Sequence, residues 1–300
     1  MIIQSGLAAV ALGLGSAISW GAGDFSGGFA TKRANTFGVV IISQLAGLIL
    51  IALLSVLSHD PIPLPGDWVW GALAGIIGGF ALLAFYRALA IGRMGIAAPV
   101  SAVFAALLPV IFAALTQGLP PVVQLLGFAL GLSGVWLLAR PEAEHGTSHE
   151  IQENLTQSEA VSQARPTGVG LAILAGFGFG SFLVLIHHAS VISAFWPLLA
   201  ARGASLVLLT GVALATQREW LPGVRLVPFL MLVGALDLGG NVLFVLAGQV
   251  GRLDVAGVLS SLYPGATVLL AVIILHERVS RTRLIGIVVA LLAVVFIALP

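Results

Sequence analysis

Two charged residues lie inside long apolar stretches of this sequence, where charge is rare and chemistry is most informative. Asp237 lies near the centre of the stretch 226–248, Asn241 follows one helical turn later on the same face, and Arg202 lies inside the stretch 194–216. A charge at mid-bilayer costs at least about 2.5–3.5 kcal/mol, so each such residue requires a partner, a wet cavity or both. Two interpretations follow: the residues line a solute path in which Asp237 binds a proton or a cationic group, or an Arg202–Asp237 pair joins two helices.

Other polar or aromatic residues in the apolar stretches are further candidates for the same path. Gln44 lies one-third into its stretch, and Tyr263 lies deep in another, where a buried hydroxyl requires a hydrogen-bond partner. Tyr86 closes the third stretch, as a cavity wall or an interfacial aromatic residue. Asp24, after Trp20, falls at the inner end of the first stretch, which favours a helix end over a pathway role. The predicted pathway residues are Asp237, Asn241, Arg202, Gln44, Tyr263, Tyr86, Trp20 and Asp24.

The sequence offers little for catalysis, metal binding or nucleic-acid binding. It has no cysteine, no Walker A lysine motif, and no HExxH or GxSxG pattern. Adjacent His187 and His188 point in different directions on a helix, so they do not predict a shared metal site. The net charge of +1 gives no basic field for nucleic acid. We therefore predict no catalytic residues, no metal, no cofactor and no enzymatic activity.

Composition places most of the chain in lipid. Of its 300 residues, 59% are hydrophobic and 8% are charged, against about 25% charged in soluble domains. The mean hydropathy is +1.11. A spanning helix needs about 20 apolar residues. Ten stretches qualify, at about 6–25, 37–57, 68–90, 96–116, 122–139, 168–186, 194–216, 226–248, 255–275 and 284–299.

The chain also repeats itself. Residues 85–139 align without gaps on 244–298, with Gly92-Arg93 matching Gly251-Arg252. Glutamate, serine and threonine dominate residues 140–167, as in a flexible linker. We predict a first five-helix repeat at 1–140, a polar linker at 141–167 and a second repeat at 168–300.

An odd number of spans per repeat makes the second repeat cross the membrane in the opposite sense. The predicted fold is an all-α integral membrane protein with ten transmembrane helices, arranged as two inverted five-helix repeats around a central cavity. Pro109 and Pro264 interrupt equivalent spans, the fourth and the ninth, and bent helices there suit alternating access.

Positive charge marks the cytoplasmic side. With ten spans, nearly all loop Lys and Arg residues fall on the side opposite the N-terminus, and Arg252 alone falls on the other. We predict a multi-pass inner (plasma) membrane protein with both termini outside and a cytoplasmic linker.

Several short segments carry a resemblance to a known family: Ser19-Trp20-Gly21, Asp24-Phe25, 86–92, 98–101, 261–264 and His276-Glu277-Arg278. On these segments the sequence resembles the EamA-type transporters of the drug/metabolite transporter superfamily. The resemblance covers nearly the whole chain and implies a ten-helix secondary carrier, often an exporter of amino acids or other metabolites. His276 stands where that family has Gly in a Gly-Glu-Arg motif, and the equivalent Gln117-Gly118-Leu119 lacks the Glu-Arg pair.

We accordingly predict efflux of small metabolites, such as amino acids or amphipathic compounds, by alternating access, with protons as a candidate coupling ion. A sugar or other uptake carrier is the nearest alternative, although a sugar site would present more Asn, Gln and Trp contacts to hydroxyls. A membrane-embedded enzyme would need clustered nucleophiles on facing spans, and an accessory membrane subunit without transport would have a dry, packed centre. The sequence leaves a monomer and a homodimer equally open.

Overall fold

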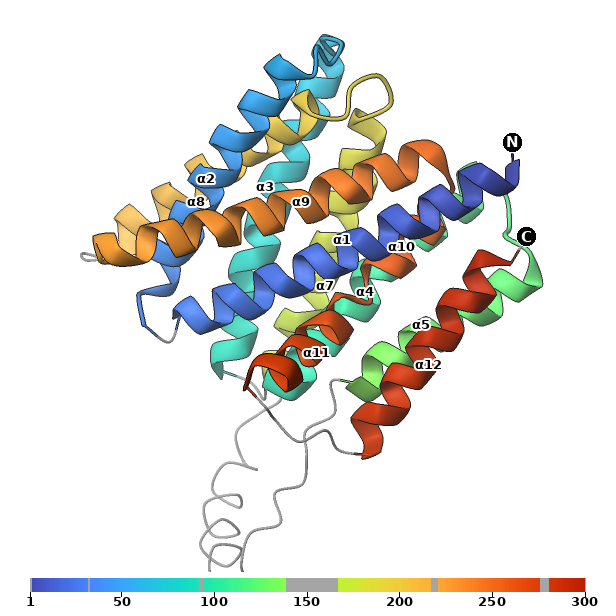
Figure 1. The fold of residues 1–300 in the computed structure, drawn as a ribbon. Coiled ribbons are helices and arrows are strands. Elements are labelled where there is room, and N and C mark those ends of the chain that lie inside the picture. Colours follow the sequence, from blue (N-terminus) through green and yellow to red (C-terminus); the bar gives the residue numbers. More distant parts are fainter. Residues whose placement is uncertain are drawn as a thin grey trace, which may run out of the picture.

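The computed structural model describes residues 2–31, 33–91, 94–138, 167–216, 221–275 and 281–299. Every regular element within these ranges is a helix (Figure 1). The predicted linker lies almost wholly outside them. The helices are α1 (Ile2–Thr31), α2 (Thr36–Leu57), α3 (Pro65–Ile91), α4 (Met94–Thr116), α5 (Val122–Leu138), α7 (Thr167–Ala189), α8 (Trp196–Thr216), the 3₁₀ turn η1 (Val224–Leu226), α9 (Val227–Val250), α10 (Leu253–Ser260), α11 (Tyr263–Leu275) and α12 (Arg281–Ala298).

Helix length and hydropathy support six of the ten predicted spans. Stretches of α1, α2, α3, α7, α8 and α9 are long and apolar enough to cross a membrane. Shorter apolar helices cover Val100–Thr116, Val122–Leu137 and Leu284–Ile297. Each of the six long helices falls where the sequence predicts one.

Helix α1 extends beyond its predicted end, and this difference moves Asp24. The helix continues to Thr31 because its last turns pack on the second repeat: Ala30 is fully buried, in a cluster with Val39 and Leu230. Asp24 therefore lies about two turns inside the helix. The interpretation of Asp24 as the end of the first span is wrong, because the glycines and serine that follow it are helical.

The predicted ninth span is two helices, and the break comes just before Pro264. Proline has no N–H to bond the carbonyl of Ser260, four residues back. The chain instead closes tighter turns, with Leu262 N bonding Leu259 O at 3.2 Å and Gly265 N bonding Leu262 O at 2.8 Å. The corresponding expectation for Pro109 is wrong, since α4 runs unbroken through it.

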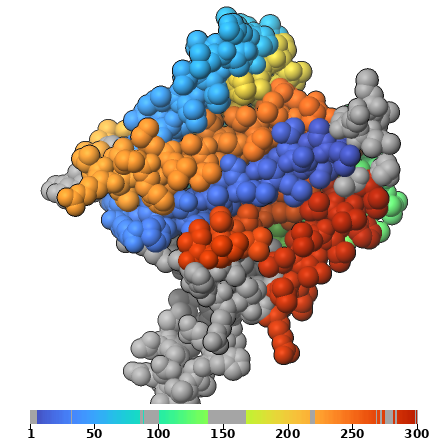
Figure 2. Space-filling model, in the orientation of Figure 1, coloured from blue at the N-terminus to red at the C-terminus, as the bar shows by residue number. Residues whose placement is uncertain are grey.

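The helices form two layers of the same design, shown in Figure 1. In one layer α1 packs between α9 and the broken pair α10/α11, and in the other α7 packs between α3 and α4. In the space-filling view α1 runs along the surface between α9 and α11 (Figure 2). The pairs α2/α8 and α5/α12 lie at the two flanks of the layers.

The most extensive contacts between the repeats occur in related pairs, as an internal two-fold relation requires: α1 on α9 matches α7 on α3, and α2 on α9 matches α8 on α3. Trp20 of α1 stacks on Phe244 of α9 with ring centroids 6.2 Å apart, and Phe179 of α7 meets Phe85 of α3 at 5.9 Å. The second pair lies in the ungapped register that already matches Phe85 with Phe244. The register of the repeat therefore extends from the aligned segment to α1 and α7.

Equivalent helices of the two repeats run antiparallel where they meet. Between α2 and α8, Gly47 faces Arg202 while the earlier residue Gln44 bonds the later residue Ser205. Between α5 and α12, Gly127 faces Ile297, and Gly134 faces Ala290. The pair α4/α10 follows the same rule. Equivalent helices thus point in opposite directions along the bundle.

Candidate functional site

The buried guanidinium of Arg202 organises a polar cluster between α8, α9 and α2. It forms an ion pair with the carboxylate of Asp237 and donates a hydrogen bond to Gln44 Oε1. Arg202 is 7% exposed, whereas the side chain of Asp237 is 45% exposed. The Arg202–Asp237 pair, one of the two arrangements considered from the sequence, is present, and Gln44 joins it.

The surroundings of Arg202 leave its charge little freedom. Gly47 lies against it, since a Cβ there would stand 3.4 Å from Arg202 Cζ. Gln44 Nε2 donates to Ser205 Oγ at 3.4 Å, which orients the amide with its oxygen toward the guanidinium. One nitrogen, Nη2, meets the Asp237 carboxylate without an aligned hydrogen bond. Arg202 is therefore held as a partner of Asp237 and Gln44.

Three side chains of α1 hold α9 through its backbone. Ser16 Oγ donates to Gly240 O at 2.8 Å, and Ser19 Oγ donates to Leu236 O at 2.6 Å. Trp20 Nε1 donates to Asp237 O at 3.2 Å. This bond fixes the indole directly beside the residue that pairs with Arg202. Glycines at 239 and 240 make the approach possible, because a Cβ at either position would collide with Ser19 or Trp20.

An aromatic group surrounds this point. Trp20 stacks on Phe244 and meets the edge of Tyr263 with centroids 6.4 Å apart. Tyr263 begins α11, immediately after the break, and Thr267 of α11 donates to Gly21 O of α1 at 3.1 Å. The broken helix is thus fastened to α1 at the level of the aromatic group.

Asp24 borders the same cluster from α1. It is exposed, and its carboxyl group lies within electrostatic range of the Asp237 carboxylate and of the Tyr263 hydroxyl. Gly23, beside it, packs on the backbone of Asp237. The structure therefore gathers Asp24, Asp237 and Tyr263, which are far apart in the sequence.

Two of the predicted pathway residues, Asn241 and Tyr86, are not shown to take part in the polar cluster. Asn241 is 8% exposed and donates through Nδ2 to Asp237 O at 2.7 Å, so its amide bonds its own helix and does not reach the Asp237 carboxylate. The side chain of Tyr86 lies outside the described residues.

Sequence reasoning missed the hydroxyls of Ser16, Ser19, Ser205 and Thr267. Small polar residues in an apolar helix are easily accommodated by their own backbone, and only the partner helix reveals a longer-range bond. The available signal was the spacing of Ser16, Ser19 and Trp20, which places all three on one face of a helix.

One end of the bundle, where α4 meets α10, is closely fastened. Arg252 pairs with the fully buried Asp254 at 2.7 Å and donates to Gln117 O and Gly118 O at the end of α4. Beside it, Asp60 accepts hydrogen bonds from Ser193 Oγ at 2.5 Å and from the backbone of the α7–α8 turn. The two layers meet here, with α10 on α4, and within the described part of the chain α11 has no comparable contact with α4.

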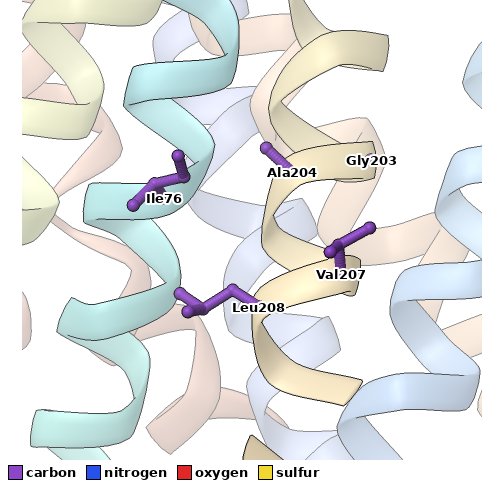
Figure 3. A pocket seen from close by; sticks show the side chains of 5 residues that line it. All are labelled: Ile76, Gly203, Ala204, Val207 and Leu208. Atoms are coloured by element: carbon purple, nitrogen blue, oxygen red, sulfur yellow. The ribbon is translucent and has the colours of Figure 1, made fainter. Parts of the chain in front are cut away.

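A separate apolar pocket of about 370 Å³ lies between α3 and α8 (Figure 3). Its lining is Ile76, Gly203, Ala204, Val207 and Leu208. Val207 is 75% exposed, and no polar side chain enters the lining. An open apolar groove of this kind suits the lipid-facing surface, so the polar cluster remains the candidate site.

Comparison with known proteins gives one family and one fold. A model of the EamA-like transporter family matches residues 7–140 and again residues 166–299. A solved structure described only as "Crystal structure of protein" is similar in fold, with a TM-score of 0.73 at 18% sequence identity, over 96% of this chain and 95% of that chain. No curated protein matches the chain.

Proposed function

Because the chain belongs to the EamA-like transporter family, with one match in each half, we propose that it is a secondary carrier that exports a small metabolite by alternating access. The observation that carries the proposal is the polar cluster of Asp24, Asp237, Arg202 and Gln44. It lies inside helices that are apolar enough to span a membrane. Partly exposed carboxylates at that depth favour a wet path for solute over a dry, packed centre.

Inverted ten-span topology is part of the proposal. The six long helices, the three shorter apolar ones and the broken pair α10/α11 together make ten crossings. Antiparallel packing of equivalent helices supports opposite insertion of the two repeats, at 1–140 and 168–300, joined by the linker at 141–167. The path runs between the two layers.

We place both termini outside the cell and the linker in the cytoplasm, in the inner (plasma) membrane. Arg33, Arg225 and Arg281 follow or precede helix ends on the linker side. Arg252, at the opposite end, is neutralised by Asp254, so it weighs little against this orientation. Alkaline phosphatase fused after residue 300 should be active, and the same enzyme inserted at 150 should be inactive; the reverse pattern would overturn the orientation.

The fastened end then faces outside, and the described form is closed there. Release of Arg252 and Asp60 from their partners is the change that would open an outward path, while the layers close at the linker side. A carrier of this design needs no cofactor or metal, and protons are the proposed coupling ion.

Flux through proteoliposomes tests the proposal. Purified protein is assayed with a panel of labelled amines, amino acids and sugars, with and without a pH gradient, for wild type, Asp237→Asn and Asp67→Asn. Asp67 lies at the start of α3, where it accepts a hydrogen bond from Leu64 N, so it is the matched acid outside the cluster. We expect saturable, gradient-dependent flux in wild type and Asp67→Asn, and loss of it in Asp237→Asn.

Flux that is the same in all three proteins would reduce Asp237 to a structural link. Protein-dependent flux of sugars alone would replace the metabolite exporter with a sugar carrier. No flux of any compound would leave the chain without a transport activity and would overturn the proposal.

A further inference from the structure

Among the described residues, Asp24 is the carboxyl group of the cluster that has no ion-pair partner. Arg202 forms its ion pair with Asp237, and within the described part of the chain no Lys, Arg or His lies within ion-pair distance of Asp24. Within the described residues, the cluster therefore has two carboxyl groups and one cation. An ionised carboxylate inside a span requires a counter-charge that it meets in a wet cavity.

The residues around Asp24 indicate which kind of cation would fit beside it. Trp20 lies one helical turn before it on the same face of α1, and Tyr263 places its hydroxyl within electrostatic reach of the carboxylate. The edge of Tyr263 meets Trp20, and Phe244 stacks behind the indole. A carboxylate attracts an organic cation through its charge, and an aromatic face beside it attracts the same cation through the electrons of the ring.

Arg202 argues against a free carboxylate on the same ligand. Its guanidinium is 7% exposed and already engages Asp237 and Gln44. A zwitterion would have to displace Asp237 in order to pair its own carboxylate, whereas an amine would meet Asp24 without breaking an existing pair.

We propose that Asp24 binds the ammonium group of an organic monoamine, whose apolar part lies against Trp20 and Tyr263. The inference rests on the proposed carrier function and names its substrate class: cationic amines in preference to zwitterionic amino acids, sugars or anions. Asp24 is the recognition residue, and the Arg202–Asp237–Gln44 group positions α8, α9 and α2 around it.

Ligand-dependent thermal stabilisation of the full chain in nanodiscs tests this assignment without any flux. The probes are 2-phenylethylamine, the neutral 2-phenylethanol, the anion phenylacetate and the zwitterion phenylalanine, at matched ionic strength. Wild type should show saturable stabilisation with 2-phenylethylamine alone. Asp24→Asn should weaken that apparent affinity about tenfold or more, because an unpaired charge remains on the ligand. Asp24→Glu should keep most of it, and Asp67→Asn all of it.

Three results would overturn the proposal: equal stabilisation by 2-phenylethanol, stabilisation by phenylalanine but not by 2-phenylethylamine, or unchanged amine affinity in Asp24→Asn. A carboxylate that serves protons alone would also give no saturable amine binding. If Asp24→Asn does not fold, the comparison of the four probes on wild type still decides. If no amine binding is found but another solute is transported in proteoliposomes, the amine proposal is wrong and the proposed carrier function stands.

Discussion

The interface of α1 with α9 and the interface of α7 with α3 are related by the internal repeat, yet their chemistry differs. Both cross in the same register, with one aromatic pair at the same point. The first is polar and the second is apolar at the matching positions. In that order the pairs are Ser16 and Ala175, Ser19 and Gly178, Trp20 and Phe179, Asp24 and Leu183, Asp237 and Gly78, and Asn241 and Leu82.

The apolar interface shows that this helix crossing is stable without any of those polar groups. Gly178 packs on Ala81, and Leu183 is 6% exposed in the core. Packing therefore does not require Asp24 or Asp237 at the other interface, where each carries a desolvation cost. The polar groups on one side are therefore available for the solute path proposed above, and a one-sided set would give a bound ligand a single orientation.

The largest expected effect comes from leaving one charge of the ion pair alone. Arg202→Met leaves Asp237 and Gln44 Oε1 without their partner. We expect the free energy of unfolding to fall by about 3 kcal/mol, the low end of the range for a buried pair, because the Asp237 side chain is 45% exposed. Ala201 faces Gly75 as Ser43 faces Gly234, so the next residues, Arg202 and Gln44, are counterparts, as Asp237 and Gly78 are. The double variant Arg202→Gln, Asp237→Gly therefore installs the residues of the other half and should recover most of that loss. Unfolding in detergent micelles, followed by circular dichroism, measures both. A double variant as unstable as the single one would show that the two interfaces are not interchangeable.

A smaller effect tests the symmetry of the crossing itself. Gly75 faces the carbonyl of Ala201, and its counterpart Gly234 faces the carbonyl of Ser43. A methyl group at either position collides with backbone, so Gly75→Ala and Gly234→Ala should each lower the free energy of unfolding by about 1–3 kcal/mol, to a similar extent.

Gly211→Ala is the control, since nothing lies within 4 Å of a Cβ there. Unfolding in detergent micelles, followed by circular dichroism, measures the stability of these variants as well. Loss of stability at only one of the two paired glycines would mean that the repeats do not cross in the same way.

The smallest effect concerns the hydroxyls. Ser16→Ala converts a polar position to the residue type of its counterpart, Ala175, and removes one interhelical hydrogen bond, worth about 0.6 kcal/mol in membrane proteins. Ser181→Ala on α7 loses only a bond to its own helix, at Phe177 O, and should be neutral. Thermal unfolding of the two variants side by side measures the difference. A larger loss of stability for Ser181→Ala would contradict the conclusion that α1 is the helix whose hydroxyls bond to a neighbouring helix.

The sequence predicts the repeated membrane fold and the ion pair, because hydropathy and a buried charge are both local signals. It does not predict the continuation of α1 to Thr31, since the glycines there are helical only through packing on α9. The break before Tyr263 was anticipated as an interruption at Pro264, but the unbroken path of α4 through Pro109 was not. Gly257, which faces the Pro109 ring, shows why: the partner helix makes room for it.

The candidate site was predicted residue by residue but not as an arrangement. Depth and polarity single out Asp237, Arg202 and Gln44, and the structure joins them. Only the packing of α1 on α9 shows that Asp24 is close to Asp237 and that Arg202 is already paired. Which of the two carboxyl groups has an ion-pair partner depends on contacts between helices, and these contacts cannot be predicted from a single sequence.

Thiol accessibility tests most directly whether the polar interface is wet and its counterpart dry. The chain has no cysteine, so Asp24→Cys, Leu183→Cys and Val207→Cys each introduce a single thiol. Val207 is exposed but borders the apolar groove, and it reports lipid. A charged, hydrophilic thiol reagent, applied to both sides of membrane vesicles, should modify Asp24→Cys rapidly and the other two only after denaturation. Protection of Asp24→Cys to the same degree as Val207→Cys would contradict a solute path along α1.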